Sequence, residues 1–136
     1  MRYLLDTNFL SELRREDRAN RGVLAWRMAN ATAQLAISVV SVCEIRQGIE
    51  AKRRTDPAQA GVLERWLAEI LVEFAANFLP VTIEIADRWG ILLAKINRGE
   101  RDMLIAATAL EHDLTLVTHN VSDFEDTGVR ILDPWK

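Results

Sequence analysis

The chain has 136 residues, of which 49% are hydrophobic and 27% are charged, and its formal net charge is only −3. This balance is typical of one globular domain, here residues 1–136, and it excludes a disordered chain and an overall field that attracts polyanions. No apolar run reaches the ~18 residues of a membrane span, and the single cysteine, Cys43, excludes an internal disulfide. Met1 leads directly into a strand-like run with no signal peptide, so we expect a cytoplasmic chain that does not associate with membranes.

Short apolar runs bounded by polar residues predict the strands. The first run, Arg2-Tyr3-Leu4-Leu5, ends abruptly at Asp6, which we expect at the end of a buried strand and the start of a helix. The later expected strands are residues 34–38, 79–81, 114–118 and 129–132. Pro80 restricts one of them to a sheet edge or to the start of a strand.

Segments with helical spacing lie between these strands. Apolar residues follow Asp6, Asn20 and Ser38 at helical intervals, and Asp56-Pro57 is a favourable helix start. The longest stripe is expected to form core and dimer contacts, and it comprises Leu63, Trp66, Leu67, Ile70, Leu71, Phe74 and Phe78. Ala86, Trp89, Leu93 and Ile96 are expected to form another helix, and a last one runs from Met103 to His112. Cys43 is expected in the core.

Strands that alternate with helices predict an α/β fold, a three-layer α/β/α sandwich around a mostly parallel sheet of four to five strands. In such sheets, ligands bind beyond the carboxyl ends of the strands, at a topological switch point. This rule predicts that Asp6, the helix start after Ser38, and the loop from Thr118 to Asp123 lie at one end of the molecule.

Four acids fall at that predicted end. Asp6 follows the first strand, Glu44 lies in the helix after the second, Asp102 opens a helix, and Asp123 follows the strand after it. Each acid alone has an ordinary explanation as a cap or turn residue, and Ser41-x-x-Glu44 matches a capping box. Capping does not require all of them at one end of a sheet, however. Carboxylates held together repel one another unless a cation neutralises them, and hard oxygen ligands suit Mg²⁺ or Mn²⁺.

Other site types lack their parts. The chain has no GxGxxG, GxxxxGK[ST] or GxSxG motif, and His112 and His119 with Cys43 do not make a zinc set. Acids without a phosphate-binding loop favour hydrolysis of a large polyanion, in which one or two ions activate water for attack on a phosphodiester. Two alternatives stay open at this point. One is a non-catalytic module whose acidic groove binds a basic partner, and the other is a metal-dependent phosphohydrolase acting on a small substrate.

Four segments resemble the motifs of PIN domains, in the order and spacing of the VapC ribonuclease toxins. They are Leu4-Leu5-Asp6-Thr7-Asn8, the run from Ser38 to Ile49, the run from Asp102 to Ala109, and the run from Leu116 to Glu125. The Ser11-Glu12-Leu13 continuation and the Asp133-Pro134-Trp135 ending are most similar to the FitB-type branch. The resemblance spans nearly the whole chain.

The resemblance implies the toxin of a type II toxin–antitoxin pair, a Mg²⁺-dependent endoribonuclease that cuts tRNA or ribosomal RNA with metal-activated water. Asp6, Glu44 and Asp102 match the metal-binding acids of the family, and Asp123 is a fourth catalytic candidate. Asn8, Thr118 and Asn120 are expected to support them. A homodimer and a VapB-type antitoxin, whose tail places an arginine in the acidic groove, are the implied partners.

The chain departs from the family pattern at two places. Many members carry an acid where this chain has Asn120, so either Asn120 or Asp123 completes the site. The family often has Gly-Pro-x-Asp ahead of its third motif, whereas this chain has Gly99-Glu100-Arg101-Asp102. The second departure bears on substrate preference and not on the type of reaction.

Overall fold

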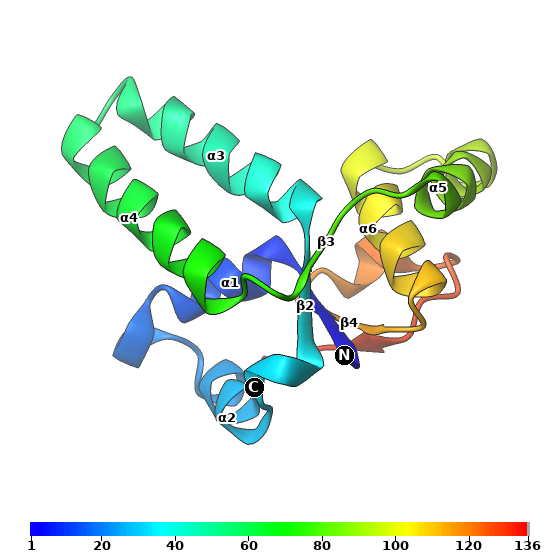
Figure 1. Cartoon of the computed structure of the whole chain (residues 1–136), viewed down its shortest axis with the longest axis horizontal. Coiled ribbons are helices and arrows are strands. Elements are labelled where there is room, and N and C mark those ends of the chain that lie inside the picture. Colours follow the sequence, from blue (N-terminus) through cyan, green and yellow to red (C-terminus); the bar gives the residue numbers. More distant parts are fainter. Residues whose placement is uncertain (136) are drawn as a thin grey trace.

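A five-stranded sheet runs through the middle of the protein, whose computed structural model describes residues 1–135 (Figure 1). The strands are Tyr3–Leu5 (β1), Leu35–Ser38 (β2), Phe78–Leu79 (β3), Thr115–Val117 (β4) and Ile131–Leu132 (β5). Their order is β3-β2-β1-β4-β5, and every pair of neighbours is parallel. The chain therefore progresses outward from β1 in one direction as far as β3 and returns to the other side of β1 with β4. This order makes the carboxyl ends of β1 and β4 the topological switch point.

Six α-helices and three short 3₁₀ helices connect the strands in the described part of the chain. The α-helices are Thr7–Leu13 (α1), Arg21–Ala29 (α2), Val39–Arg53 (α3), Pro57–Glu73 (α4), Ile83–Lys95 (α5) and Glu100–Glu111 (α6). The 3₁₀ helices are Glu16–Arg18 (η1), Thr32–Gln34 (η2) and Val121–Phe124 (η3). Two predicted helix starts are confirmed: Asn20 Oδ1 accepts hydrogen bonds from the backbone of Gly22 and Val23, and Asp56 Oδ1 accepts one from Gln59.

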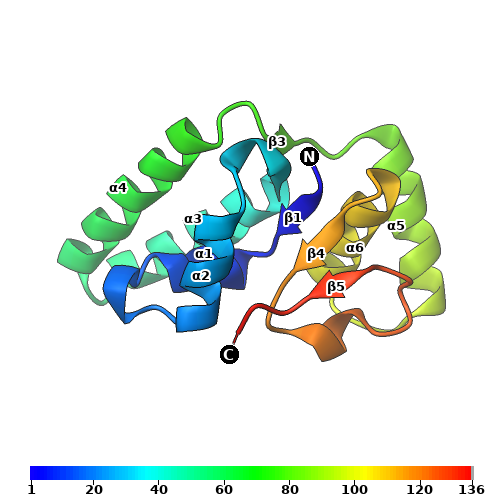
Figure 2. The same ribbon diagram turned by 90° about the horizontal axis from the view of Figure 1, so that it is seen from below.

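Alternate residues of the strands enter two separate cores, one on each face of the sheet. Leu4, Ala36 and Leu116 pack on one face with residues of α5 and α6, including Ile85 and Met103. Leu5, Ile37 and Val117 pack on the other face with residues of α1, α3 and α4, including Phe9, Ile49 and Leu67. Figure 2 shows these two groups of helices on opposite sides of the strands. The predicted three-layer α/β/α sandwich is thus confirmed, and burial on both faces explains why the strands are apolar throughout.

The helix expected for Ala86, Trp89 and Leu93 is confirmed as α5. Its buried residues are Ile85 and Leu92, and Trp89 packs partly buried against the same core. The expectation that Cys43 lies in the core was wrong. Cys43 is exposed because α3 turns Ser41 and Ile45 inward, and the position between them faces away.

Within residues 1–135, no helix is both long and apolar enough to cross a bilayer.

Candidate active site

Asp6 and Thr118 leave the sheet side by side at the switch point. β1 and β4 pair in register, with Leu5 opposite Val117, and the Asp6 backbone N–H donates to the Val117 carbonyl at 3.0 Å. The next residue of each strand therefore emerges at the same edge, and Thr118 Oγ1 donates a 2.8 Å hydrogen bond to Asp6 Oδ2. The predicted convergence of the first and fourth motifs follows directly from this parallel pairing.

Asp6 caps α1 and also forms the floor of a groove. Its Oδ1 accepts from the Thr7 backbone N–H at 2.8 Å, while Oδ2 faces Thr118 and the Asn8 amide, which donates to it at 3.4 Å. The side chain is almost fully buried, at 7% exposure. Burial raises the pKa of Asp6; the hydrogen bonds from Thr118 and Thr7 oppose the rise, and the charges of Glu44 and Asp123 add to it. Asp6 is therefore a helix cap, and the same residue lines the groove in which the site is predicted.

Glu44 points toward Asp6 from the inner side of α3. The capping-box interpretation was wrong, because α3 begins at Val39 and its cap is Ser38, whose Oγ accepts from the Val40 N–H at 3.1 Å. Thr7 Oγ1 instead lies 2.8 Å from both Glu44 Oε1 and Ser41 Oγ. Because a hydroxyl has one proton and a carboxylate only accepts, Thr7 donates to Glu44 and Ser41 directs its own proton to Thr7.

Asp102 occupies the first turn of α6, where it is partly buried. Its carboxylate forms no hydrogen bond within residues 1–135, and the cap of α6 is Gly99, which has no side chain. A Cβ at Gly99 would lie 3.3 Å from Asp102 Oδ2, so the glycine leaves room for this carboxylate. Burial raises the pKa of Asp102 to about 6, helped by the charges of Asp123, Asp6 and Glu44. A helix N-terminus alone favours the charged form, so burial and the other carboxylates dominate here.

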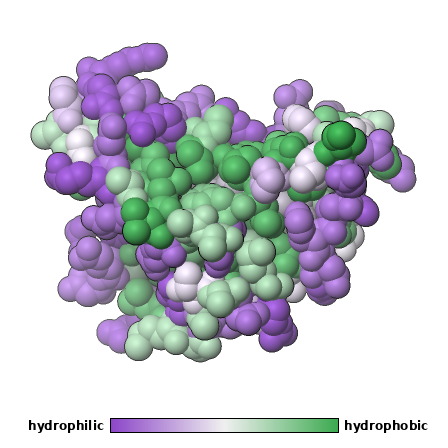
Figure 3. All heavy atoms as spheres, in the orientation of Figure 1, coloured by the Kyte–Doolittle hydropathy of each residue, from purple (hydrophilic) through white to green (hydrophobic). Residues whose placement is uncertain are grey.

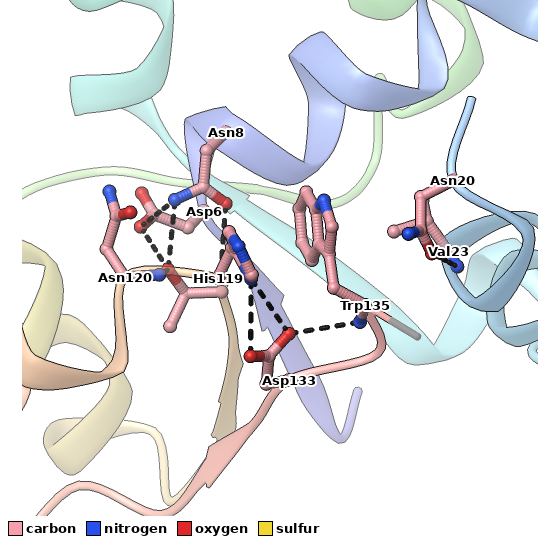
Figure 4. A network of polar contacts seen from close by, with 9 residues as sticks. Asp6, Asn8, Asn20, Val23, His119, Asn120, Asp133 and Trp135 are labelled. Carbon is pink, nitrogen blue, oxygen red and sulfur yellow. Dashed lines mark hydrogen bonds and ion pairs between the residues drawn. The ribbon is translucent and has the colours of Figure 1, made fainter. Parts of the chain in front are cut away.

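The fourth corner of the site contains both candidates. Asn120 lines the groove together with Asp6, Glu44 and Asp102, and its side-chain amide makes no hydrogen bond within the described residues. Asp123 follows in η3, and its negative charge raises the pKa of Asp6 and of Asp102. Figure 4 shows the Asn120 amide beside Asp6 and Asn8. Asn120 is thus the lining residue of this corner, and Asp123 contributes charge to it.

The groove over these residues has a volume of about 480 Å³ and two arginines on its rim, Arg14 and Arg15. None of the four acids forms an ion pair with a lysine, arginine or histidine of residues 1–135. The lining is rich in carboxylate, hydroxyl and amide oxygens, which are the ligands that Mg²⁺ and Mn²⁺ prefer. In the described part of the chain, however, no three acid, histidine or cysteine side chains converge as a preformed metal cluster. The donor types fit a divalent cation, and the excess negative charge gives such a cation an electrostatic reason to bind.

One network beside the groove was not predicted from the sequence. His119 Nδ1 lies 3.3 Å from both oxygens of Asp133, its ring stacks on Trp135 at 4.6 Å, and its backbone N–H donates to Asn8 Oδ1 at 3.3 Å (Figure 4). The Trp135 backbone N–H also donates to Asp133 Oδ1, at 3.0 Å. The C-terminal segment is therefore linked through His119 to Asn8, which contacts Asp6. The one signal in the sequence was the Asp133-Pro134-Trp135 ending.

Comparison with known proteins gives consistent matches over the full length. The family model for the PIN domain matches residues 3–129. The VapC ribonuclease Y4jK of Sinorhizobium fredii is 34% identical, with 98% of this chain and 97% of that protein aligned, and Toxin FitB of Neisseria gonorrhoeae is 32% identical, with 97% of each aligned. Among solved structures, FitAcB from Neisseria gonorrhoeae superposes with a TM-score of 0.86 at 29% identity and covers 98% of each chain. FitAB bound to a DNA fragment superposes with a TM-score of 0.85 at 28% identity, and 98% of this chain and 96% of that chain are covered.

Proposed function

Because the chain belongs to the PIN domain family, we propose that it is the toxin of a type II toxin–antitoxin pair and an endoribonuclease that hydrolyses RNA phosphodiester bonds. One observation carries the catalytic part of the proposal. Acids from three separate segments, Asp6, Glu44 and Asp102, line one groove, and no cation of the described chain neutralises them. An arrangement in which carboxylates raise the pKa of one another is costly for a structural role and useful for holding a cation.

The site is proposed to hold Mg²⁺, with Mn²⁺ as a substitute of the same ligand preference. Asp6, Glu44 and Asp102 are the proposed ligands, and the Asn120 amide oxygen or Asp123 completes the set. When bound, such a cation supplies activation of water at neutral pH and neutralisation of charge on the phosphodiester and its leaving oxygen.

The chain's own residues hold these acids in position. Thr118 and Asn8 fix Oδ2 of Asp6, and the Thr7 backbone fixes its Oδ1, so the carboxylate cannot rotate freely. Thr7 Oγ1 holds Glu44 in turn, which places a single residue, Thr7, between two of the acids. Partners of this kind orient ligands and tune the charge of a metal site. The Asp102 carboxylate accepts no hydrogen bond within residues 1–135, so it has more freedom than Asp6 or Glu44 to adjust to a bound ion.

RNA would reach this acidic groove with its own counterions and be held by the flanking arginines. Arg14 and Arg15 lie on the rim, where their charges can contact phosphates while the net charge of the chain stays at −3. The proposed substrates are tRNA or ribosomal RNA loops, because single-stranded loops expose bases and phosphates that a surface groove can reach.

The proposed protein partner is a VapB-type antitoxin, and the pair is proposed to act in the cytoplasm. The related toxin FitB has been solved as the complexes FitAcB and FitAB. An antitoxin arginine placed in the groove would satisfy the carboxylates that the chain itself leaves without a cation. This contact would exclude RNA and metal from the site.

A homodimer is also proposed, with residues 1–136 of each copy acting as one domain. Figure 3 shows apolar residues gathered over the middle of the face seen in Figure 1, with hydrophilic residues around its edge. The segments on either side of β3 contribute exposed hydrophobic side chains, with Val72 79%, Val81 41% and Ile83 85% exposed. A contiguous apolar face of this kind marks an interaction surface.

A cleavage assay on single-stranded RNA with Mg²⁺, Mn²⁺ or chelator tests the proposed activity. The purified chain is expected to cut RNA only with a divalent cation, and Asp6→Asn is expected to lose the activity while its circular dichroism spectrum is unchanged. Asp17→Asn, an exposed acid of η1, is the matched control. Folded chain that neither cuts RNA nor binds Mg²⁺ or Mn²⁺ would show the alternative function, a non-catalytic acidic groove for a basic partner.

A further inference from the structure

A second hollow of about 260 Å³ adjoins the acidic groove, between α1, α3 and α4. The two spaces share four lining residues, Thr7, Ser11, Arg14 and Glu44, so one opens beside the other. The remaining lining differs in character: Ile45, Ile49, Leu63 and Trp66 make the second hollow largely apolar, whereas the groove is lined by acids.

We propose that this hollow is a nucleotide subsite that takes the base next to the phosphodiester cut in the groove. The proposal rests on the ribonuclease function proposed above and names the place where the enzyme would contact a base. A phosphate held at the acids has a neighbouring nucleotide on each side, and the hollow begins within the same set of residues. It is large enough for one nucleobase and presents the apolar lining that a base face requires.

Arg14 and Trp66 form one end of the hollow. The Arg14 guanidinium lies over the Trp66 ring, 5.8 Å from its centroid, and Trp66 is half-buried. A tryptophan face and an arginine plane are the two surfaces on which unstacked bases pack in single-stranded RNA complexes. Arg14 has no carboxylate partner within residues 1–135, in contrast to Arg15, which pairs with Glu12 at 3.1 Å.

One face of α3 connects the acids with a cation at the far rim. Glu44, Gly48 and Lys52 are spaced four residues apart, so they lie in a row that spans about 12 Å of helix. Lys52, like Arg14, has no acidic partner among the described residues, whereas Arg53 beside it pairs with Glu50 and Glu64. The row therefore runs from the Glu44 carboxylate, at the phosphate that is cut, to the Lys52 ammonium group, which can contact the next phosphate of the RNA. This charge pattern complements RNA and not a basic peptide, which Arg14 and Lys52 would repel.

Gly48 leaves open space on α3 between Glu44 and Lys52. It lies inside α3, where glycine weakens a helix, and a Cβ at this position would meet no atom within 4 Å. The glycine is therefore not required by packing. A side chain there would instead project into the hollow, because its neighbours in the row, Glu44 and Lys52, both line it.

Gly48→Leu tests the subsite without touching an acid or a cation. The matched control is Gly90→Leu, since Gly90 is also an exposed glycine inside a helix, α5, with nothing within 4 Å of its Cβ position. Both changes favour the helix, so both variants are expected to fold, as checked by thermal melting. Binding of labelled oligouridine and oligoadenosine is measured with Ca²⁺ in place of Mg²⁺, and cleavage is measured with Mg²⁺.

We expect Gly48→Leu to weaken RNA binding about ten-fold or more, the scale of one lost base stack, and Gly90→Leu to bind as the unchanged protein does. In cleavage, Gly48→Leu should raise KM with little change in kcat. On an RNA that lacks the base next to the cut bond, this variant and the unchanged protein should have equal KM values. Equal RNA binding by the two leucine variants would overturn the subsite while leaving RNA cleavage, and so the proposed function, intact. Absence of cleavage by the unchanged protein would instead reject both the nucleotide subsite and the proposed ribonuclease function.

A third outcome would assign the hollow to a protein. If Gly48→Leu binds RNA normally but no longer copurifies with its antitoxin, the hollow is a docking site for that partner and the nucleotide proposal is wrong.

Discussion

Thr118 Oγ1 donates a 2.8 Å hydrogen bond to Asp6 Oδ2, although 112 positions separate the two residues in the sequence. Thr118 is fully buried, and the bond lowers the pKa of Asp6 against the effect of burial. A threonine that holds a buried carboxylate in its charged form keeps that carboxylate ready to bind a cation. The bond therefore joins the parallel pairing of β1 with β4 to the chemistry of the groove.

Thr118→Val is expected to reduce activity without unfolding the protein, since valine has nearly the same shape. Losing the hydrogen bond leaves Oδ2 of Asp6 less stabilised as an anion, so its pKa rises further and cation binding weakens. Loss of one such supporting contact typically costs about 10–100-fold in metal affinity or activity. RNA cleavage measured against Mg²⁺ concentration checks this. Thr108→Val is the control, because Thr108 is equally buried but donates only to the Leu104 carbonyl within α6; an equal loss in both variants would contradict the role of Thr118.

The network of His119, Asp133 and Trp135 contacts the acids only through Asn8, so we expect its loss to lower activity less than the loss of Thr118 does. Asp133→Ala removes the acceptor of both His119 Nδ1 and the Trp135 backbone N–H, so the His119 ring is less restrained and its backbone contact with Asn8 loosens. Because Asn8 contacts Asp6 through a long 3.4 Å bond, we expect a fall in kcat of up to about ten-fold. Asp126→Ala serves as control, since Asp126 is exposed and faces Arg98 at 3.7 Å. Unchanged kcat in Asp133→Ala would separate this network from the site.

The sequence predicted the meeting of Asp6 with the Thr118 loop because one rule, parallel strands with a common carboxyl edge, determines it. It did not predict how Glu44 is held. Ser38 and Ser41 are both good caps three residues apart, and only the end of β2 decides that Ser38 begins the helix. The choice between Asn120 and Asp123 depends on the η3 turn, whose backbone path has no distinctive sequence pattern. The core position expected for Cys43 was wrong for a related reason, because the sequence does not show which side of α3 faces the sheet.

The exposed apolar face predicts self-association that a single charge should weaken. Ile83→Asp places a carboxylate on this face, where burial in a dimer would require its desolvation. We expect the unchanged chain to sediment as a dimer at micromolar concentration and Ile83→Asp to shift toward the monomer. Met28→Asp is the control, because Met28 is 87% exposed but lies on α2, away from β3. A monomeric unchanged chain, or equal dissociation in both variants, would reject this face as the dimer interface.

The raised pKa of Asp102 predicts that its charge destabilises the metal-free fold. The pKa is about 6 in the folded chain against 3.8 for an ordinary aspartate, so the folded chain binds this proton more tightly than the unfolded chain does. The resulting contribution to folding stability is fully present below pH 3.8 and is lost as the pH rises through 6. Asp102→Asn, which is neutral at every pH, should be more stable than the unchanged chain at about pH 7.5, by on the order of 1 kcal/mol after allowance for solvent screening. The difference should shrink toward zero near pH 4. Urea unfolding with chelator present measures it, and a less stable Asp102→Asn at neutral pH would favour a plain helix-dipole role for this acid.

Addition of a divalent cation should reverse the order of stability in the same pair of proteins. A cation that binds only the folded chain stabilises it by about 2.7 kcal/mol when present at 100 times its dissociation constant. The unchanged chain is expected to gain thermal stability with Mg²⁺ or Mn²⁺ near pH 7.5, and Asp102→Asn to gain much less because one proposed ligand has lost its charge. The gain should fall as pH drops below about 6, since protons then compete with the cation for Asp102. Ca²⁺ serves as a comparison of equal charge, and stabilisation that is equal in both proteins would place the cation elsewhere than at Asp102.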